Sequence, residues 1–323
     1  MTLALVARKY AVAVSPTVEA LIDPADPCDP IARQFLPDIA ELVETEEERA
    51  DPIGDHPHQA VPGIVHRHPD RVLFKAVASC PVYCRFCFRR EQIGPGKTNM
   101  LSPEDLERAF QYIQTHPEIW EVILTGGDPF ILSPRRAAGI TGRLAATGHV
   151  KIIRWHTRVP MVDPSRVSDD FIAALLAPAV TPWIAIHANH PREFSPDARR
   201  ALARLADAGI PLVSQTVLLK GINDDVETLA SLMRAFVENR VKPYYLHHPD
   251  LARGTSHFRP TIQQGLELTR ALRARHSGLA QPLYVLDIPG GHGKVPLDSN
   301  QVEKSAGGYR IRDFKGRWHD YRG

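Results

Sequence analysis

Short apolar runs alternate with segments of helical periodicity between residues 67 and 290. This alternation is typical of a parallel α/β sheet, because each strand needs a crossover helix before the next parallel strand. We predict strands at 72–77, 122–124, 150–155, 183–188, 211–219 and 243–247, with a further candidate at 283–286. Six strand–helix units without a long interruption favour a barrel or partial barrel over a two-domain dinucleotide-binding fold.

Three predicted helices begin with a serine followed by a proline, at Ser102, Ser133 and Ser195. The serine hydroxyl can accept a hydrogen bond from a free backbone N–H group, and proline suits the first helical position. Gly209 follows the helical pattern of residues 197–208 and predicts the end of that helix.

The two ends of the chain differ from this core. Residues 1–66 are rich in proline and acidic residues, so we predict an arm of short helices, with the glutamates of 44–48 on a solvated face. The end of the chain predicts a hairpin, with strands at 309–314 and 317–321 and a turn at Lys315 and Gly316. The predicted parts are therefore the arm at 1–66, the core at 67–290 and the tail at 291–323.

Composition narrows the classes of function. The chain has 323 residues, 43% of them hydrophobic, which is enough for a large core. A formal net charge of +2 is too balanced for a protein that holds a polyanion, so we expect no nucleic-acid partner. No uninterrupted apolar stretch is long enough to span a membrane, and Arg8, Lys9 and Tyr10 interrupt the apolar N-terminus. We expect a cytoplasmic protein.

Three of the four cysteines, Cys80, Cys84 and Cys87, form a C-x3-C-x2-C cluster directly after the first predicted strand. Loops at the carboxyl ends of parallel strands converge on the site of a barrel, so this position indicates a metal site. Three thiolates do not complete a zinc site, and Cys28 lies in the distant arm. A 4Fe-4S cluster can be held by three cysteines with one iron open to another ligand. A zinc site completed by a histidine, or three unrelated thiols, are the alternatives.

This spacing resembles the radical S-adenosylmethionine (SAM) superfamily, and a second motif strengthens the resemblance. Gly126, Gly127 and Asp128 follow the second predicted strand, where the superfamily has a segment that meets the methionyl amino group of SAM. The resemblance implies a partial (β/α)6 barrel, similar to a TIM barrel, with a 4Fe-4S cluster and SAM as cofactors. It also implies that Phe86 lies near the adenine.

Lys294 follows the glycine-rich segment 287–293. A flexible loop and a desolvated amine suit Schiff-base formation with an aldehyde, although a solvated surface lysine is the plainer interpretation. Here the chain resembles the lysine 2,3-aminomutase family, radical SAM enzymes that also carry pyridoxal 5′-phosphate (PLP). The resemblance extends over roughly residues 20–300, and its motifs include 61–63, 66–73, 187–191, 215–223, 254–259 and 289–296.

The resemblance implies a role for each matching residue. Lys294 would hold PLP, and Arg67, His68 and Arg71 would bind its phosphate, although the family has a tyrosine at the place of His68. Arg89 would pair with the substrate carboxylate, whereas we expect Arg90 to be structural. The remaining matches are two aspartates for the distal ammonium of lysine and two residues bordering SAM: Asp250, Asp287, His187 and Gln215.

The implied activity is that of an isomerase that converts L-lysine to β-lysine by 2,3-migration of the amino group. A one-electron reductant such as flavodoxin or ferredoxin would be the protein partner, and the chain could also form a homo-oligomer. The first alternative is the same chemistry supplying β-lysine for the modification of elongation factor P, since the chain is shorter than the fermentative enzymes. The second, of a different class, is a non-catalytic iron-sulfur or zinc-binding module.

Overall fold

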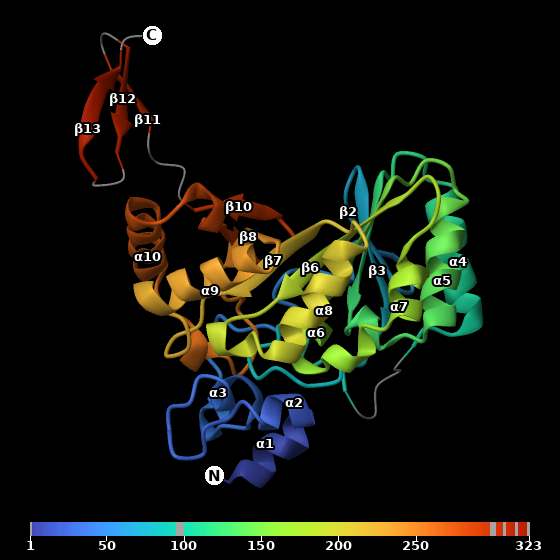
Figure 1. Cartoon of the computed structure of the whole chain (residues 1–323), viewed down its shortest axis with the longest axis horizontal. Helices are drawn as coiled ribbons and strands as arrows, with labels where there is room; N and C mark the ends of the chain where they lie inside the picture. The colour runs from blue at the N-terminus through green and yellow to red at the C-terminus, as the bar shows by residue number, and fades with distance from the viewer. Residues whose placement is uncertain (1, 95–99, 298–301, 306–307, 314–315, 322–323) are drawn as a thin grey trace.

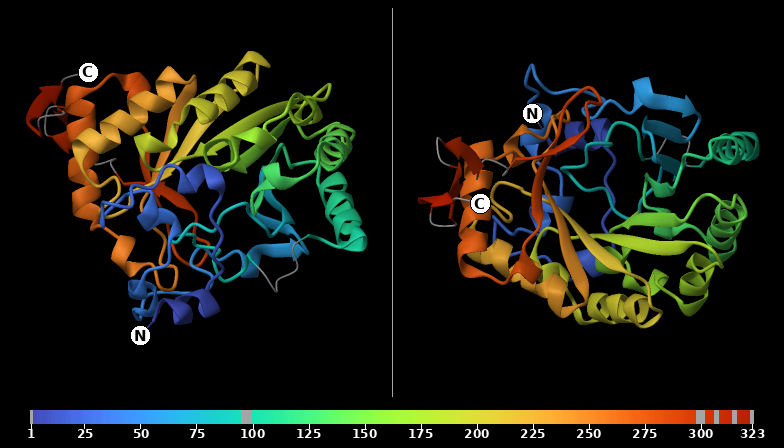
Figure 2. Two further views of the ribbon diagram at one scale, coloured as in Figure 1. Left: turned by 60° about the horizontal axis from the view of Figure 1, so that its bottom comes forward. Right: turned by 90° about the horizontal axis from the view of Figure 1, so that it is seen from above.

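The computed structural model describes residues 2–94, 100–297, 302–305, 308–313 and 316–321. Its main feature is an open ten-stranded sheet in which the strands follow one another in chain order, β1 to β10. Seven central strands are parallel and match the seven predicted ones: β3 (Arg71–Val77), β4 (Glu121–Gly126), β5 (Ile152–Thr157), β6 (Thr181–His187), β7 (Leu212–Val217), β8 (Val241–His247) and β9 (Leu283–Asp287). The sheet curves into the partial barrel that the sequence predicted (Figures 1 and 2).

Short antiparallel strands extend the sheet at both edges, and the sequence analysis did not predict them. β1 (Gln59–Val61) and β2 (Ile64–His68) precede β3, and β10 (Lys294–Pro296) folds back on β9. The register pairs His68 with Arg71 at one edge and Lys294 with Asp287 at the other. The two edges of the sheet therefore carry the residues proposed for PLP.

In the described part of the chain, seven helices connect or flank the parallel strands. They are α4 (Pro103–Gln114), α5 (Pro134–Ala145), α6 (Val159–Val162), α7 (Asp169–Leu175), α8 (Pro196–Asp207), α9 (Val226–Glu238) and α10 (Ile262–Arg275). Ser102, Ser133 and Ser195 cap α4, α5 and α8 as predicted, each accepting a hydrogen bond from the third helical N–H group. Each cap contributes about 1 kcal/mol. Gly209 follows α8 with a positive φ of 76°.

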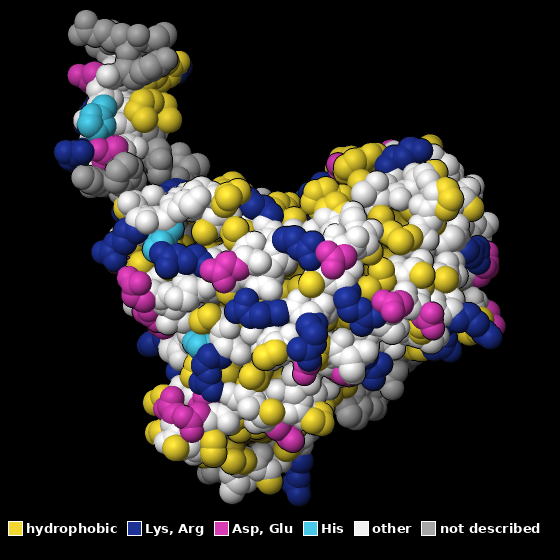
Figure 3. All heavy atoms as spheres, viewed as in Figure 1, with side chains coloured by type: hydrophobic (Ala, Val, Ile, Leu, Met, Phe, Trp, Pro, Cys, Tyr) yellow, Lys and Arg dark blue, Asp and Glu magenta, His cyan; other side chains and the backbone are white. Residues whose placement is uncertain are grey.

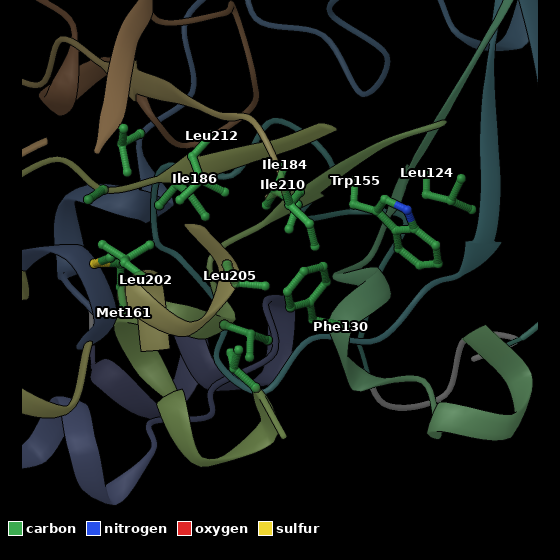
Figure 4. Close-up of a cluster of buried hydrophobic side chains, with 14 of the residues drawn as sticks. Leu124, Phe130, Trp155, Met161, Ile184, Ile186, Leu202, Leu205, Ile210 and Leu212 are labelled. Carbon is green, nitrogen blue, oxygen red and sulfur yellow. The ribbon is translucent and has the colours of Figure 1, made fainter. Parts of the chain in front are cut away.

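The main apolar core lies between the sheet and these helices. Trp155 from β5 packs against Phe130, and Leu205 from α8 lies close by (Figure 4). Short 3-10 turns link the elements: η3 (Pro129–Ile131), η4 (Pro164–Arg166), η5 (Pro191–Glu193), η6 (Ser256–Phe258) and η7 (Gly278–Ala280). The core holds the sheet rigid behind the loops at its carboxyl edge.

The N-terminal arm lies beneath the partial barrel, at the bottom of Figure 1. It contains α1 (Leu3–Lys9), α2 (Pro16–Glu19), α3 (Ala32–Phe35), η1 (Ile39–Leu42) and η2 (His56–His58). The prediction that all the glutamates of 44–48 are solvated is wrong for Glu48. Its buried carboxylate accepts a hydrogen bond from the Gly254 N–H at 2.9 Å and pairs with Arg259 at 3.1 Å.

The tail forms a separate three-stranded antiparallel sheet of β11 (Val302–Ser305), β12 (Gly308–Arg312) and β13 (Trp318–Tyr321). The predicted hairpin corresponds to β12 and β13, whereas β11 was not predicted; Phe314 and Lys315 lie outside the described residues. The division into parts at 66 and 290 stays a prediction. No described helix has both the length and the apolar composition needed to cross a membrane. Basic and acidic side chains are interspersed on the face in Figure 3.

Candidate active site

The loop after β3 carries Cys80, Cys84 and Cys87, all partly buried. Burial, followed by the neighbouring Cys84, raises the pKa of the Cys87 thiol to about 11, and burial also raises the pKa of Cys80 and Cys84. Three thiols so close and so poorly solvated resist ionisation unless a cation offsets their charge. An iron-sulfur cluster provides such an offset, so the donor set fits this cofactor.

The same loop does not build a site for a single zinc ion. Cys28 is exposed in the arm, and among the described residues no group of three or more His, Cys, Asp or Glu side chains is arranged to hold one metal ion. A cubane cluster has a different requirement, because each cysteine binds a different iron. The three thiols therefore suit a cluster better than the zinc alternative.

Gly126 and Gly127 bring the end of β4 against the segment that leads into Cys80. The Gly127 N–H donates to the carbonyl of Val77 at 2.7 Å, and a Cβ atom at Gly127 would lie 2.2 Å from the carbonyl oxygen of Ser79. Only glycine permits so close an approach of two backbones. This pair of glycines thus positions the cysteine loop, whatever further contact it makes with SAM.

The carboxylate of Asp128 is hydrogen-bonded to other groups of the protein. Its carboxylate accepts hydrogen bonds from Thr157 Oγ1 at 2.7 Å, the Arg158 N–H at 2.7 Å and the Phe130 N–H at 3.0 Å. Burial raises the pKa of Asp128 and outweighs these hydrogen bonds, which lower it. Asp128 therefore joins the turn after β4 to the end of β5, and its predicted contact with SAM stays a prediction.

Phe86, within the cysteine loop, lies against His187, and Gln215 is next to His187 in the sheet. The ring centroids of Phe86 and His187 are 5.6 Å apart, and Gln215 on β7 is in register with His187 on β6. Nε2 of His187 is buried without a hydrogen-bond partner among the described residues. Since burial of an unpaired nitrogen is costly, this atom marks a place that a ligand can satisfy.

Lys294 lies inside the partial barrel rather than on an outer turn. Its Nζ pairs with Asp287, lies 3.2 Å from Nδ1 of His247 and is 5.3 Å from the ring centroid of Tyr245. Burial, with the charge of Lys294, lowers the pKa of His247 to about 4. His247 is therefore neutral at pH 7 and can accept a hydrogen bond from the lysine.

The residues proposed for the PLP phosphate lie next to the lysine loop. A Cβ atom at Gly293 would lie 3.8 Å from Cε1 of His68, and burial together with Arg71 and Arg67 lowers the pKa of His68. Nε of Arg67 is buried without a partner among the described residues. Two guanidinium groups and an imidazole in one place, one of them with an unused donor, fit a phosphate.

Arg89 is buried and held by Asp55, a residue that the sequence analysis missed. Arg89 Nη2 lies 3.1 Å from Asp55 Oδ2, Arg67 Nη2 lies 3.1 Å from Asp55 Oδ1, and Lys75 Nζ lies 3.6 Å from Oδ2. Asp55 is 1% exposed. One carboxylate among three cations leaves a net positive region that favours anionic groups. Asp55 belongs to no motif, so the sequence carries no signal for it.

Asp250 and Asp287 lie at the same end of the site. Burial, followed by the charge of Asp287, raises the pKa of Asp250 to about 7, while Lys294 and Arg89 lower it. Asp287 is paired with Lys294, whereas among the described residues only burial and neighbouring charges act on the pKa of Asp250. The site therefore combines a cationic region around Arg89 with two carboxylates.

Comparison with known proteins identifies the family. The model of the Radical SAM superfamily matches residues 76–233. L-lysine 2,3-aminomutase of Clostridium subterminale is 37% identical over 96% of this chain and 74% of its own length. The enzyme of the same name from Fusobacterium nucleatum is 39% identical over 94% of this chain and 71% of its own length. The chain belongs to the lysine 2,3-aminomutase family. Glutamate 2,3-aminomutase of Clostridioides difficile is also similar, with 36% identity over 97% of this chain and 74% of that protein.

Membership of the lysine 2,3-aminomutase family makes the protein an enzyme of the isomerase class, so the non-catalytic module is wrong. It also implies a 4Fe-4S cluster, SAM and PLP as cofactors. The cysteine loop and the Lys294 site fit these groups. Arg90 is structural as predicted, since it pairs with Glu41 and donates to the carbonyl of Arg85 at 2.7 Å.

The two halves of this aminomutase-family site face a common interior. Lys294 contacts His247 at the end of β8, and His187 at the end of β6 lies against Phe86 next to Cys87. Burial, followed by Arg158 and His247, lowers the pKa of His187. The cysteines and the lysine, far apart in the sequence, thus lie at the same carboxyl edge of the sheet.

Proposed function

We propose that this protein converts L-lysine to β-lysine by moving the amino group from C2 to C3, with a 4Fe-4S cluster, SAM and PLP as cofactors. Two observations support lysine as the substrate: the names of the relatives, and the two carboxylates of Asp250 and Asp287 in the same site as the buried Arg89. The carboxylate pair carries the proposal, because it is complementary to the distal ammonium of lysine.

The same pair argues against glutamate, the substrate named for one relative. The distal carboxylate of glutamate would meet two aspartates in a partly buried place, where like charges repel strongly. An uncharged distal group would leave the buried acids unpaired, at a cost of about 1–3 kcal/mol. A cationic side chain is therefore preferred over both.

Arg89 and the two aspartates would fix the substrate from its two ends. The guanidinium of Arg89 is anchored by Asp55 at 3.1 Å, so its remaining N–H groups are oriented without freedom to turn. A substrate held by a carboxylate at one end and an ammonium at the other cannot rotate, which places its β-carbon reproducibly. When bound, SAM at the reduced cluster supplies a radical able to remove an unactivated hydrogen, and PLP supplies a conjugated system that stabilises a neighbouring radical.

Lys294 needs a proton acceptor before its amine becomes nucleophilic. Asp287 and His247 both contact Nζ, and His247 is neutral at pH 7 because burial lowers its pKa to about 4. Nδ1 of His247, 3.2 Å from Nζ, can therefore accept a hydrogen bond that orients the amine, while the proton of the ammonium passes to water, to which Lys294 is 25% exposed, and Asp287 keeps its negative charge. Loss of the charge on Lys294 would then free Asp287 for the ammonium of the substrate.

The test is product formation by the anaerobically reconstituted full-length chain. L-lysine, SAM and dithionite should give β-lysine, identified by mass spectrometry, while glutamate, alanine and ornithine should give little or no amino-group migration. Asp250→Asn should raise the KM for lysine at least tenfold, since it removes one of two carboxylates that receive the ammonium. Faster turnover of glutamate than of lysine would refute the proposal.

A further inference from the structure

Arg158 follows β5 and extends its guanidinium group to the cysteine loop. Nη1 donates a hydrogen bond to Sγ of Cys84 at 3.1 Å, and Nη2 donates to Oε2 of Glu193 at 2.7 Å. The side chains of Arg158 and Glu193 are 6% and 2% exposed. A positive charge thus lies against one predicted cluster ligand in a place that water scarcely reaches.

The position of this guanidinium group is fixed from several elements. The backbone N–H of Arg158 donates to Asp128 at 2.7 Å, and its Nη2 also donates to Oε1 of Gln34 at 2.6 Å. The guanidinium carbon lies 4.5 Å from the ring centroid of Phe35. The arm and η5 therefore hold the guanidinium group and the turn after β4 holds the backbone of the same residue, which leaves Nη1 directed at the sulfur.

Glu193 offsets the charge of Arg158 only in part. Its Oε1 accepts hydrogen bonds from the N–H groups of Asn189 at 2.8 Å and His190 at 3.0 Å. A buried ion pair adds little to stability compared with apolar residues of the same size. A role in stability alone therefore does not explain why the charged end of Arg158 lies at the cysteine sulfur.

We propose that Arg158 raises the reduction potential of the 4Fe-4S cluster through its hydrogen bond to Cys84, and that Glu193 limits this effect. On reduction the cluster takes one electron from a one-electron reductant, and its core loses one unit of positive charge while no bond or proton changes. Part of the added negative charge resides on the cysteine sulfurs. A hydrogen bond and a cation at Cys84 stabilise it, so the reduced state becomes easier to reach.

This proposal predicts that two variants of the Arg158–Glu193 ion pair shift the midpoint potential of the cluster in opposite directions. The double variant Arg158→Met with Glu193→Gln removes both charges and leaves no buried ion unpaired, and its cluster should have a lower midpoint potential. The single variant Glu193→Gln keeps Arg158 and removes its counter-charge, so its potential should be higher. Arg192→Lys is the matched control: it alters the arginine of η5 next to Glu193, which binds Asp29 instead of a cysteine, and should leave the potential unchanged.

The measurement is a redox titration of the reconstituted full-length protein, followed by electron paramagnetic resonance without SAM or amino acid. It tests Arg158 independently of the substrate, so failure to form β-lysine would not affect the result. Iron content confirms the cluster in each variant, and Glu193→Gln, which retains Arg158, provides the test alone if the double variant loses its cluster. A double variant with an equal or higher potential, or Glu193→Gln with an equal or lower one, would overturn the proposal.

Discussion

Asp250 has an electrostatic environment unlike that of Asp287, although both are predicted to receive the same ammonium group. Burial and the negative charge of Asp287 raise the pKa of Asp250 to about 7. The contact with His247, whose Nδ1 lies 3.6 Å from Oδ2, and the ion pair with Lys294 hold the pKa of Asp287 well below its usual range. At neutral pH the site therefore carries one carboxylate that stays ionised and one whose ionisation is disfavoured.

This difference predicts a pH dependence of substrate binding. Only the ionised form of Asp250 attracts an ammonium group, and a raised pKa means that the group is protonated below about pH 7. The KM for lysine should therefore rise as the pH falls from 8 to 6, by up to about tenfold per pH unit below the pKa. Steady-state kinetics over this range measures the effect. Asp250→Asn should show a higher KM with a flat profile, and a flat profile for the unsubstituted enzyme would contradict the prediction.

The sequence could predict a site residue only where the residues that act together lie in one short segment of the chain. The cysteines lie within eight positions, and Lys294 lies in a glycine-rich loop, so both were predicted. Asp55 and Lys75 were missed because neither belongs to a motif, and only folding brings them to Arg89. Arg158 and His247 were missed for the same reason: their functional contacts are with Cys84 and Lys294, distant in the chain.

At the scale of elements, the sequence predicted the parallel strands and missed the short antiparallel ones. The parallel strands are apolar runs flanked by helices, a pattern that a single sequence displays. β1, β2 and β10 have three to five residues and no crossover helix, so no periodic signal marks them. The prediction that Glu48 is solvated was wrong for a related reason: its partners Gly254 and Arg259 lie in a loop that is distant in the sequence.

The contact between β3 and β4 gives a prediction for the cysteine loop. Gly127→Ala would place a methyl group 2.2 Å from the carbonyl of Ser79, next to Cys80, so the two segments must separate. We expect the reconstituted variant to bind less than half the iron of the unsubstituted protein, measured by colorimetric iron analysis. Gly139→Ala on α5 is the control. Nothing lies within 4 Å of its added Cβ, so it should keep full iron content and gain about 0.5–1 kcal/mol of stability. Normal iron content in Gly127→Ala would show that the close approach is dispensable.

At the scale of the whole molecule, the N-terminal arm packs against the cysteine loop. The Tyr83 N–H donates to the carbonyl of Ala13 at 3.1 Å, and the Arg85 N–H donates to that of Gln34 at 2.8 Å. Gln34 also accepts a hydrogen bond from Arg158, next to Cys84. The arm is therefore part of the cluster site and not an independent appendage.

The carboxylate of Glu41 joins the arm to the cysteine loop, and its removal should lower the free energy of unfolding of the whole protein. It is fully buried, pairs with Arg90, and accepts from Nε of Arg85 at 2.9 Å. Glu41→Gln would leave two buried guanidinium groups without a counter-charge, which typically costs about 3–5 kcal/mol. Urea unfolding should show this loss, whereas Glu107→Gln, at an exposed pair with Arg143, should lose less than about 1 kcal/mol. Because Arg85 and Arg90 flank Cys87, Glu41→Gln should also bind the cluster less tightly. Equal losses in the two variants would mean that the arm is held by its backbone hydrogen bonds and apolar contacts instead of by this carboxylate.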